Sequence, residues 1–168
     1  MHPVSPSRPS EDEVGGTRLV LRDGSAASVR VAEAADRDQV RRFFHELSPD
    51  SRRKRFFTAG EPPDQVVDRL CDGSDPSHTL TLIVDRQVDG RVRPIAVASY
   101  IALTHTTAEV AFAVDDRYQG KGIGTSLLDR LAALARRHGF HRFQATTLAD
   151  NLAMLEVFRD SGFEIRSK

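Results

Sequence analysis

Three glycines at alternate positions, Gly120, Gly122 and Gly124, precede an amphipathic helical repeat. The first backbone N–H groups of a helix have no partner within it. Glycines leave room for a ligand to approach them, and an anion there also meets the positive end of the helix dipole. The spacing therefore predicts a phosphate-binding turn. Its expected residues are Gln119, Gly120, Lys121, Gly122, Ile123, Gly124 and Thr125.

The alternative is a glycine-rich turn that binds nothing. Each glycine costs roughly 0.5–1 kcal/mol relative to alanine in a regular element, and a plain turn rarely needs three, so the phosphate interpretation is favoured. Two common phosphate motifs do not fit. The P-loop needs glycine at position 115 and a hydroxyl residue at 122, where the chain has Asp115 and Gly122. The dinucleotide fingerprint needs glycine at 125, which is Thr125.

A strand and a helix must hold this turn. Large and small apolar residues alternate over 110–114, which predicts a buried strand that ends at Asp115. Apolar residues then recur every three or four positions from Ile123 to Leu134, as on one face of a helix. Gly139 is a typical residue for the end of that helix.

The rest of the chain alternates between strand and helix signals. A hairpin is expected over 17–32 around Asp23-Gly24. Three helices follow, with further strands at 79–84, 95–103, 142–147 and 163–165. Asp150-Asn151 opens a late helix that is expected to turn Leu152, Leu155 and Phe158 inward. The order predicts an α/β (α+β) domain of three layers with a mixed central sheet.

Composition narrows the class of protein. The 168 residues carry 24 basic and 24 acidic side chains, so nothing indicates nucleic-acid binding. The single cysteine, Cys71, forms no internal disulfide and has no activating base pair beside it. No apolar run reaches membrane-spanning length. We expect a disordered tail over 1–16, one domain over 17–168, no membrane association and a cytoplasmic location.

The loop matches Q-x-x-G-x-G through Gln119, Gly122 and Gly124. In this, the chain resembles the GNAT (Gcn5-related N-acetyltransferase) superfamily over about 28–165. The resemblance implies a mostly antiparallel sheet with helices on both faces, and acetyl-CoA as co-substrate with no metal. It also implies that the loop binds the coenzyme diphosphate. The pantetheine arm would meet the strand backbone at Phe112, Ala113 and Val114, and the side chain of Asn151.

Acetyl transfer to an amine needs the neutral amine, and deprotonating a lysine of pKa about 10.4 at pH 7 costs roughly 4–5 kcal/mol. A nearby carboxylate can take that proton. Glu109 begins the apolar strand, where several enzymes of the family keep their base. The alternative is a glutamate in a salt bridge. Flanking Ala108, Val110 and Ala111 offer no local partner, which favours the base.

The general acid is not evident. Many family members supply a tyrosine from the late helix, but this chain has Phe158 in that place. Tyr118 is expected to pack, and His105 is expected to lie on the surface in a turn. Neither is assigned a catalytic role.

Several segments resemble a narrower branch, the Pat-type protein lysine acetyltransferases of bacteria. That resemblance implies a protein substrate, such as an AMP-forming acyl-CoA synthetase, and a possible fused acyl-CoA synthetase-like domain beyond Lys168. Arg52, Arg53 and Arg55 belong to a basic run that forms either a solvated face or a substrate-binding patch for an acidic partner. A small-molecule amine acetyltransferase and a non-catalytic acetyl-CoA sensor remain alternatives.

Overall fold

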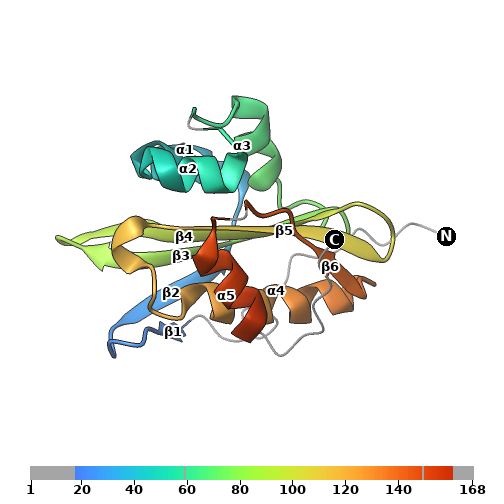
Figure 1. Cartoon of the computed structure of the whole chain (residues 1–168). Coiled ribbons are helices and arrows are strands. Elements are labelled where there is room, and N and C mark those ends of the chain that lie inside the picture. The colour runs from blue at the N-terminus through green and yellow to red at the C-terminus, as the bar shows by residue number, and fades with distance from the viewer. Residues whose placement is uncertain (1–17, 59, 149, 161–168) are drawn as a thin grey trace.

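A computed structural model describes residues 18–58, 60–148 and 150–160 of the chain (Figure 1). Its middle layer is a sheet whose six strands lie in chain order. Neighbouring strands are antiparallel, except that β5 and β6 are parallel. The strands are β1 Arg18–Val20, β2 Ala26–Val31, β3 Thr79–Val88, β4 Arg91–Ala102, β5 Thr107–Val114 and β6 Arg142–Gln144.

Helices cover both faces of the sheet, which confirms the expected fold class (Figure 1). One face carries the short η1 Ala34–Asp36 with α1 Arg37–Glu46, α2 Pro49–Phe56 and α3 Asp64–Leu70. The other face carries α4 Ile123–Arg137 and α5 Leu152–Asp160. A single turn, η2 Asp116–Tyr118, links β5 to the loop before α4.

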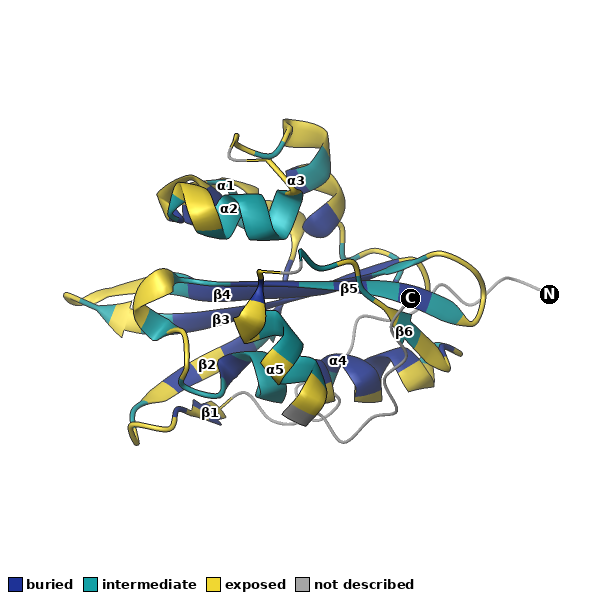
Figure 2. Cartoon of the chain, viewed as in Figure 1, coloured by how far each residue is buried: buried dark blue, intermediate teal, exposed yellow. Residues whose placement is uncertain are grey.

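Two apolar cores fill the spaces between these layers, and the alternation along β5 separates them. Ala108, Val110 and Phe112 pack in the core beneath the sheet with α4. Ala113 packs in the other core with the residues of α1 and α3. Figure 2 shows the strands buried in the middle and the outer helix faces exposed. Even-numbered side chains of β5 therefore point toward α4, and odd-numbered ones point toward α1 and α3.

The two hairpins follow from their turn residues. Gly24, at φ 85°, closes the β1–β2 turn as the Asp23-Gly24 signal predicts. The β3–β4 hairpin is longer than the sequence suggested, because both strands continue through polar residues to the Asp89-Gly90 turn. Both residues of that turn have positive φ, 51° and 77°, as a two-residue hairpin turn requires.

Two local expectations were wrong. Strand β6 ends at Gln144, because its pairing with β5 stops at Glu109. Leu152 is 71% exposed rather than inward, and Leu155 is not among the described residues that pack against the core. Phe158 packs against the core as expected, together with Met154 and Val157. The expected tail over 1–16 and the expected strand at 163–165 lie outside the described residues.

Candidate active site

The turn before α4 has the backbone that its glycines predict. Gly120 and Gly122 have φ of 75° and 86°, and Gly122 is the N-terminal cap of the helix. The first helical hydrogen bond runs from the Ser126 N–H to the Gly122 carbonyl over 3.2 Å. Within the described part of the chain, the N–H groups of residues 120–125 have no hydrogen-bond acceptor. These groups are therefore available to a ligand that accepts hydrogen bonds.

Gly124 serves a different purpose from the other two glycines. A Cβ atom added there would lie 2.9 Å from Cγ2 of Val157 on α5. The glycine thus permits close packing of α4 against α5. All three glycines have a structural reason, so their number alone does not establish a ligand site. The argument for a ligand site rests on the unpaired N–H groups.

A cavity of about 150 Å³ opens beside this turn. Its walls come from five places: the β1–β2 turn, the side of α2, the end of β5, the loop before α4 with the first turn of that helix, and the start of α5. The expected coenzyme-binding residues all line it, with the exception of Lys121. They are Phe112, Ala113, Val114, Gln119, Gly120, Gly122, Ile123, Gly124, Thr125 and Asn151.

The edge of β5 is open beside this cavity. The Asp115 N–H donates to the Ile95 carbonyl over 2.8 Å, so odd-numbered β5 residues direct their backbone groups toward β4. The even-numbered Phe112 and Val114 therefore direct theirs away from β4. Strand β6 pairs with β5 only as far as Glu109, which leaves this edge unpaired by any described strand. The side-chain amide of Gln119 donates to the Val114 carbonyl over 3.1 Å and closes the loop onto the strand.

Lys121 does not face the cavity. Its Nζ donates to the Asp23 carboxylate on the β1–β2 turn over 2.8 Å. This bond from Lys121, together with bonds from Ser25, holds the pKa of Asp23 well below its usual range. Arg22, which precedes Asp23 on the β1–β2 turn, lines the cavity in place of Lys121. Sequence reasoning missed Arg22, because the contact between this turn and a loop 98 positions away arises only in the folded sheet.

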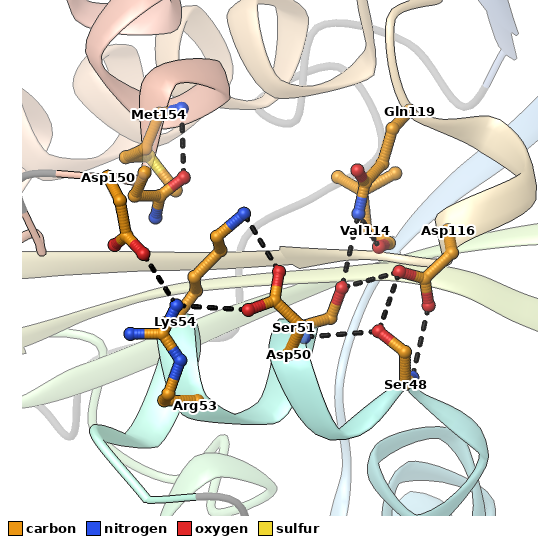
Figure 3. A network of polar contacts seen from close by, with 11 residues as sticks. Ser48, Asp50, Ser51, Arg53, Lys54, Val114, Asp116, Gln119, Asp150 and Met154 are labelled. Atoms are coloured by element: carbon orange, nitrogen blue, oxygen red, sulfur yellow. Dashed lines mark hydrogen bonds and ion pairs between the residues drawn. The ribbon is translucent and has the colours of Figure 1, made fainter.

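The basic run on α2 is engaged within the chain rather than displayed as a patch. Arg52 donates to the His45 carbonyl over 3.2 Å. Arg53 bridges Asp50 and Asp150 at 2.9 and 2.7 Å, which links α2 to the residues just before α5 (Figure 3). The Arg55 guanidinium lies 4.6 Å from the centre of the Phe56 ring. Lys54 and Arg55 also line the cavity.

The same helix is fastened at its other end to the turn after β5. The Asp116 carboxylate accepts hydrogen bonds from the Ser48 N–H, the Ser48 hydroxyl and the Ser51 hydroxyl, at 3.1, 2.9 and 2.6 Å (Figure 3). Burial raises the pKa of Asp116, but the bonds from Ser51 and Ser48 outweigh it, and the pKa lies below its ordinary value. Residues Ser48 and Ser51 therefore hold α2 above the mouth of the cavity.

Glu109 is half-buried on the face of β5 that α2 covers, opposite Ile101 of β4. It does not line the cavity, but Arg55, which does, feels its charge. Burial lowers the pKa of Arg55 to about 10, and the Glu109 carboxylate opposes that shift. Glu109 therefore has a cation nearby, Arg55 on α2. The sequence did not reveal it, because the two residues are 54 positions apart in the chain.

Asn151 is buried, and its side-chain oxygen accepts a hydrogen bond from the Met154 N–H over 3.3 Å. It therefore caps α5 as well as lining the cavity. Tyr118 packs against the core, and the guanidinium of Arg86 lies 5.2 Å from its ring centre. Tyr100 is buried and donates to the Pro76 carbonyl, so its hydroxyl is occupied. Cys71 is buried, which raises the pKa of its thiol to about 11.

Comparison with known proteins identifies the family. The model of the acetyltransferase (GNAT) family matches residues 37–163. The chain therefore belongs to the GNAT acetyltransferase family. Within the described ranges, no helix is both long and apolar enough to cross a membrane. In the same ranges, no group of three or more His, Cys, Asp or Glu side chains is arranged to hold a metal ion.

Three relatives show how far the similarity extends. An acetyltransferase of Pseudomonas aeruginosa is 30% identical over 145 residues, which cover 85% of this chain and 77% of that protein. Acetyltransferase Pat of Mycolicibacterium smegmatis is 34% identical over 115 residues, which cover 67% of this chain but only 33% of that protein. The crystal structure of the GNAT domain of S. lividans PAT superposes with a TM-score of 0.78 at 31% identity, covering 89% of this chain and 88% of that one.

Proposed function

We propose that this acetyltransferase transfers the acetyl group of acetyl-CoA to an amine, and that the amine is a lysine side chain of a protein. The use of acetyl-CoA is supported by the cavity. It brings together the unpaired N–H groups before α4 and the open edge of β5. A diphosphate fits the first feature, and an extended chain containing amides fits the second. Acetyl-CoA contains both in that order.

Each group of residues binds the part of the coenzyme that its position allows. The N–H groups of residues 120–125 bind the diphosphate, and Phe112 and Val114 bind the arm through their backbone. An arm running along β5 toward its start approaches Glu109, whose charge acts on Arg55, and so approaches the end of the cavity that Arg55 lines. Asn151 and Ala113 also line the cavity.

The chemistry is direct attack of the amine on the thioester that the coenzyme supplies. Glu109 removes the proton from the attacking nitrogen, through a water molecule at the end lined by Arg55. A backbone N–H of β5, from Phe112 or Val114, polarises the carbonyl oxygen. The departing thiolate needs only modest help, because a thiol has a pKa near about 8.5. No tyrosine is required at the place of Phe158.

The protein-lysine substrate is supported by similarity to the two Pat proteins. On that basis we propose an AMP-forming acyl-CoA synthetase as the partner and a cytoplasmic location. This chain spans one third of the Mycolicibacterium protein, so the activity of a longer chain with a fused acyl-CoA synthetase-like domain is part of the same proposal. Lys54 and Arg55 are the members of the basic run that line the cavity, and Lys54 is paired with Asp50, so Arg55 is the one placed to meet the acceptor.

Binding and turnover of acetyl-CoA by the wild type and by Glu109→Gln test the mechanism. We expect calorimetry to give the same affinity for both proteins, because Glu109 does not line the cavity. We expect turnover to fall by about two to four orders of magnitude, the usual contribution of a general base. Equal turnover would remove Glu109 from the mechanism.

The acceptor is tested by incubating the protein with labelled acetyl-CoA and either an acyl-CoA synthetase or a panel of small amines. Label on a synthetase lysine supports the proposal. Label on small amines alone would assign a small-molecule acetyltransferase. Tight binding of acetyl-CoA without transfer to the synthetase or to the small amines would indicate a non-catalytic acetyl-CoA sensor.

A further inference from the structure

The β1–β2 turn lies against the loop that precedes α4. The Arg22 N–H donates to the Lys121 carbonyl over 3.0 Å, and the Asp23 carboxylate accepts from Lys121 Nζ over 2.8 Å. The turn itself is fixed, because Leu21 and Ser25 are joined by a backbone bond of 2.8 Å and Gly24 closes on the Leu21 carbonyl. Arg22 is thus presented on a rigid corner beside the phosphate-binding turn.

The two cations at this corner are in different states. Lys121 forms an ion pair with Asp23, so the charge of the pair is cancelled locally. The Arg22 guanidinium has no hydrogen-bond or ion-pair partner among the described residues, and it lines the cavity. A guanidinium also fits phosphate oxygens better than an ammonium does, because it donates two parallel hydrogen bonds.

The backbone of Gly122 makes room for this side chain. A Cβ atom at Gly122 would lie 3.2 Å from Nε of Arg22. The helix cap, whose own N–H is unpaired, and the guanidinium therefore lie side by side at one wall of the cavity.

We propose that Arg22 is the side-chain cation that binds the coenzyme diphosphate, and that Lys121 is a structural tie that holds the β1–β2 turn in place through Asp23. The proposal deepens the proposed function and rests on it. It differs from the expectation that Lys121 belongs to the phosphate-binding residues. It also makes the N-terminal hairpin part of the coenzyme site.

Titration calorimetry of Arg22→Ala, Arg22→Lys and Lys121→Met with acetyl-CoA tests the assignment. We expect Arg22→Ala to weaken binding by about tenfold or more, the effect of a lost charge-assisted hydrogen bond. Arg22→Lys should recover part of that loss, because the charge remains without the two parallel donors. Lys121→Met should weaken binding by less than about threefold, since its charge is already paired and the backbone bond from Arg22 to the Lys121 carbonyl still holds the turn. A larger loss from Lys121→Met than from Arg22→Ala would overturn the proposal.

Ligands that lack defined groups identify the phosphate concerned. Acetyl-dephospho-CoA keeps the diphosphate but lacks the 3′-phosphate, and acetylpantetheine lacks both. We expect Arg22→Ala to lose the same factor with acetyl-CoA and acetyl-dephospho-CoA, and nothing with acetylpantetheine. A loss confined to acetyl-CoA would place Arg22 at the 3′-phosphate and overturn the assignment. Failure of the wild type to bind acetyl-CoA would instead refute the proposed function itself.

Discussion

Gly122 and Gly124 stand two residues apart, yet the structure requires glycine at each for a different reason. Gly122 has φ of 86°, a conformation that side chains disfavour by roughly 1–2 kcal/mol. Gly124 has ordinary helical geometry but lies under Val157, where a Cβ would approach to 2.9 Å. One position is therefore set by the local backbone and the other by a neighbouring helix.

This difference predicts which substitution can be rescued. We expect Gly124→Ala to lower the free energy of unfolding by about 1–2 kcal/mol, because overpacking outweighs the helix preference for alanine. In a Val157→Ala background the same change should no longer destabilise. Urea denaturation of the four proteins measures this. Gly120→Ala in both Val157 backgrounds is the control: its cost comes from φ of 75° and not from packing, since a Cβ there meets nothing within 4 Å, so it should be the same in both. An identical loss in both Val157 backgrounds would contradict the packing explanation.

At the scale of elements, α2 is held at its start by Asp116 and near its end by Arg53. The first attachment consists of three hydrogen bonds to one carboxylate. The second bridges to Asp150 at the start of α5 (Figure 3). Together they fix the distance between the layers at the mouth of the cavity.

The lowered pKa of Asp116 gives its attachment a pH dependence. A carboxyl group with a lowered pKa in the folded state stabilises the fold above its unfolded pKa, and this contribution is lost as the pH falls through the folded value. We expect Asp116→Asn to cost about 1 kcal/mol at pH 7. The difference from wild type should shrink below about pH 4.

Urea denaturation of both proteins at several pH values tests this expectation. Asp115→Asn is the matched control, because among the residues that the structure describes the Asp115 side chain bonds only to Arg117 in the same turn. A difference between Asp116→Asn and wild type that stays constant down to the acid range would show that the charge of Asp116 is not what holds α2.

Sequence patterns revealed elements whose signals are local. The Asp23-Gly24 turn, the α4 stripe and the Pro49 helix start were all predictable, because propensity and periodicity act within a few residues. The polar ends of β3 and β4 were missed, since two exposed strands lack the alternation that marks a buried one. The roles of Arg22 and Lys121 were out of reach, because they depend on which distant segments the sheet brings together.

At the scale of the whole molecule, the cavity is bounded by parts of both helical layers and of the sheet. A ligand that fills it therefore joins elements from the beginning, middle and end of the described chain. Such a ligand stabilises the folded state by RT ln(1 + L/Kd), where L is the free ligand concentration, which is about 2.7 kcal/mol when L is one hundred times Kd.

We therefore expect acetyl-CoA at that concentration to raise the melting temperature by about 5–10 °C. Differential scanning fluorimetry measures the shift. Gly122→Val should melt at a lower temperature than wild type, because valine is strained at φ of 86°, and should show no shift. A full shift in this variant would mean that the ligand stabilises the protein from another place.

The unpaired edge of β5 also matters when the coenzyme is scarce. Backbone donors and acceptors on a free strand edge are a template for pairing with another polypeptide. Beyond Glu109, neither a charged side chain nor a proline on β5 discourages such pairing. Under the proposed function the coenzyme covers this edge, which no described strand pairs, so preparations stripped of the coenzyme are expected to self-associate and precipitate first.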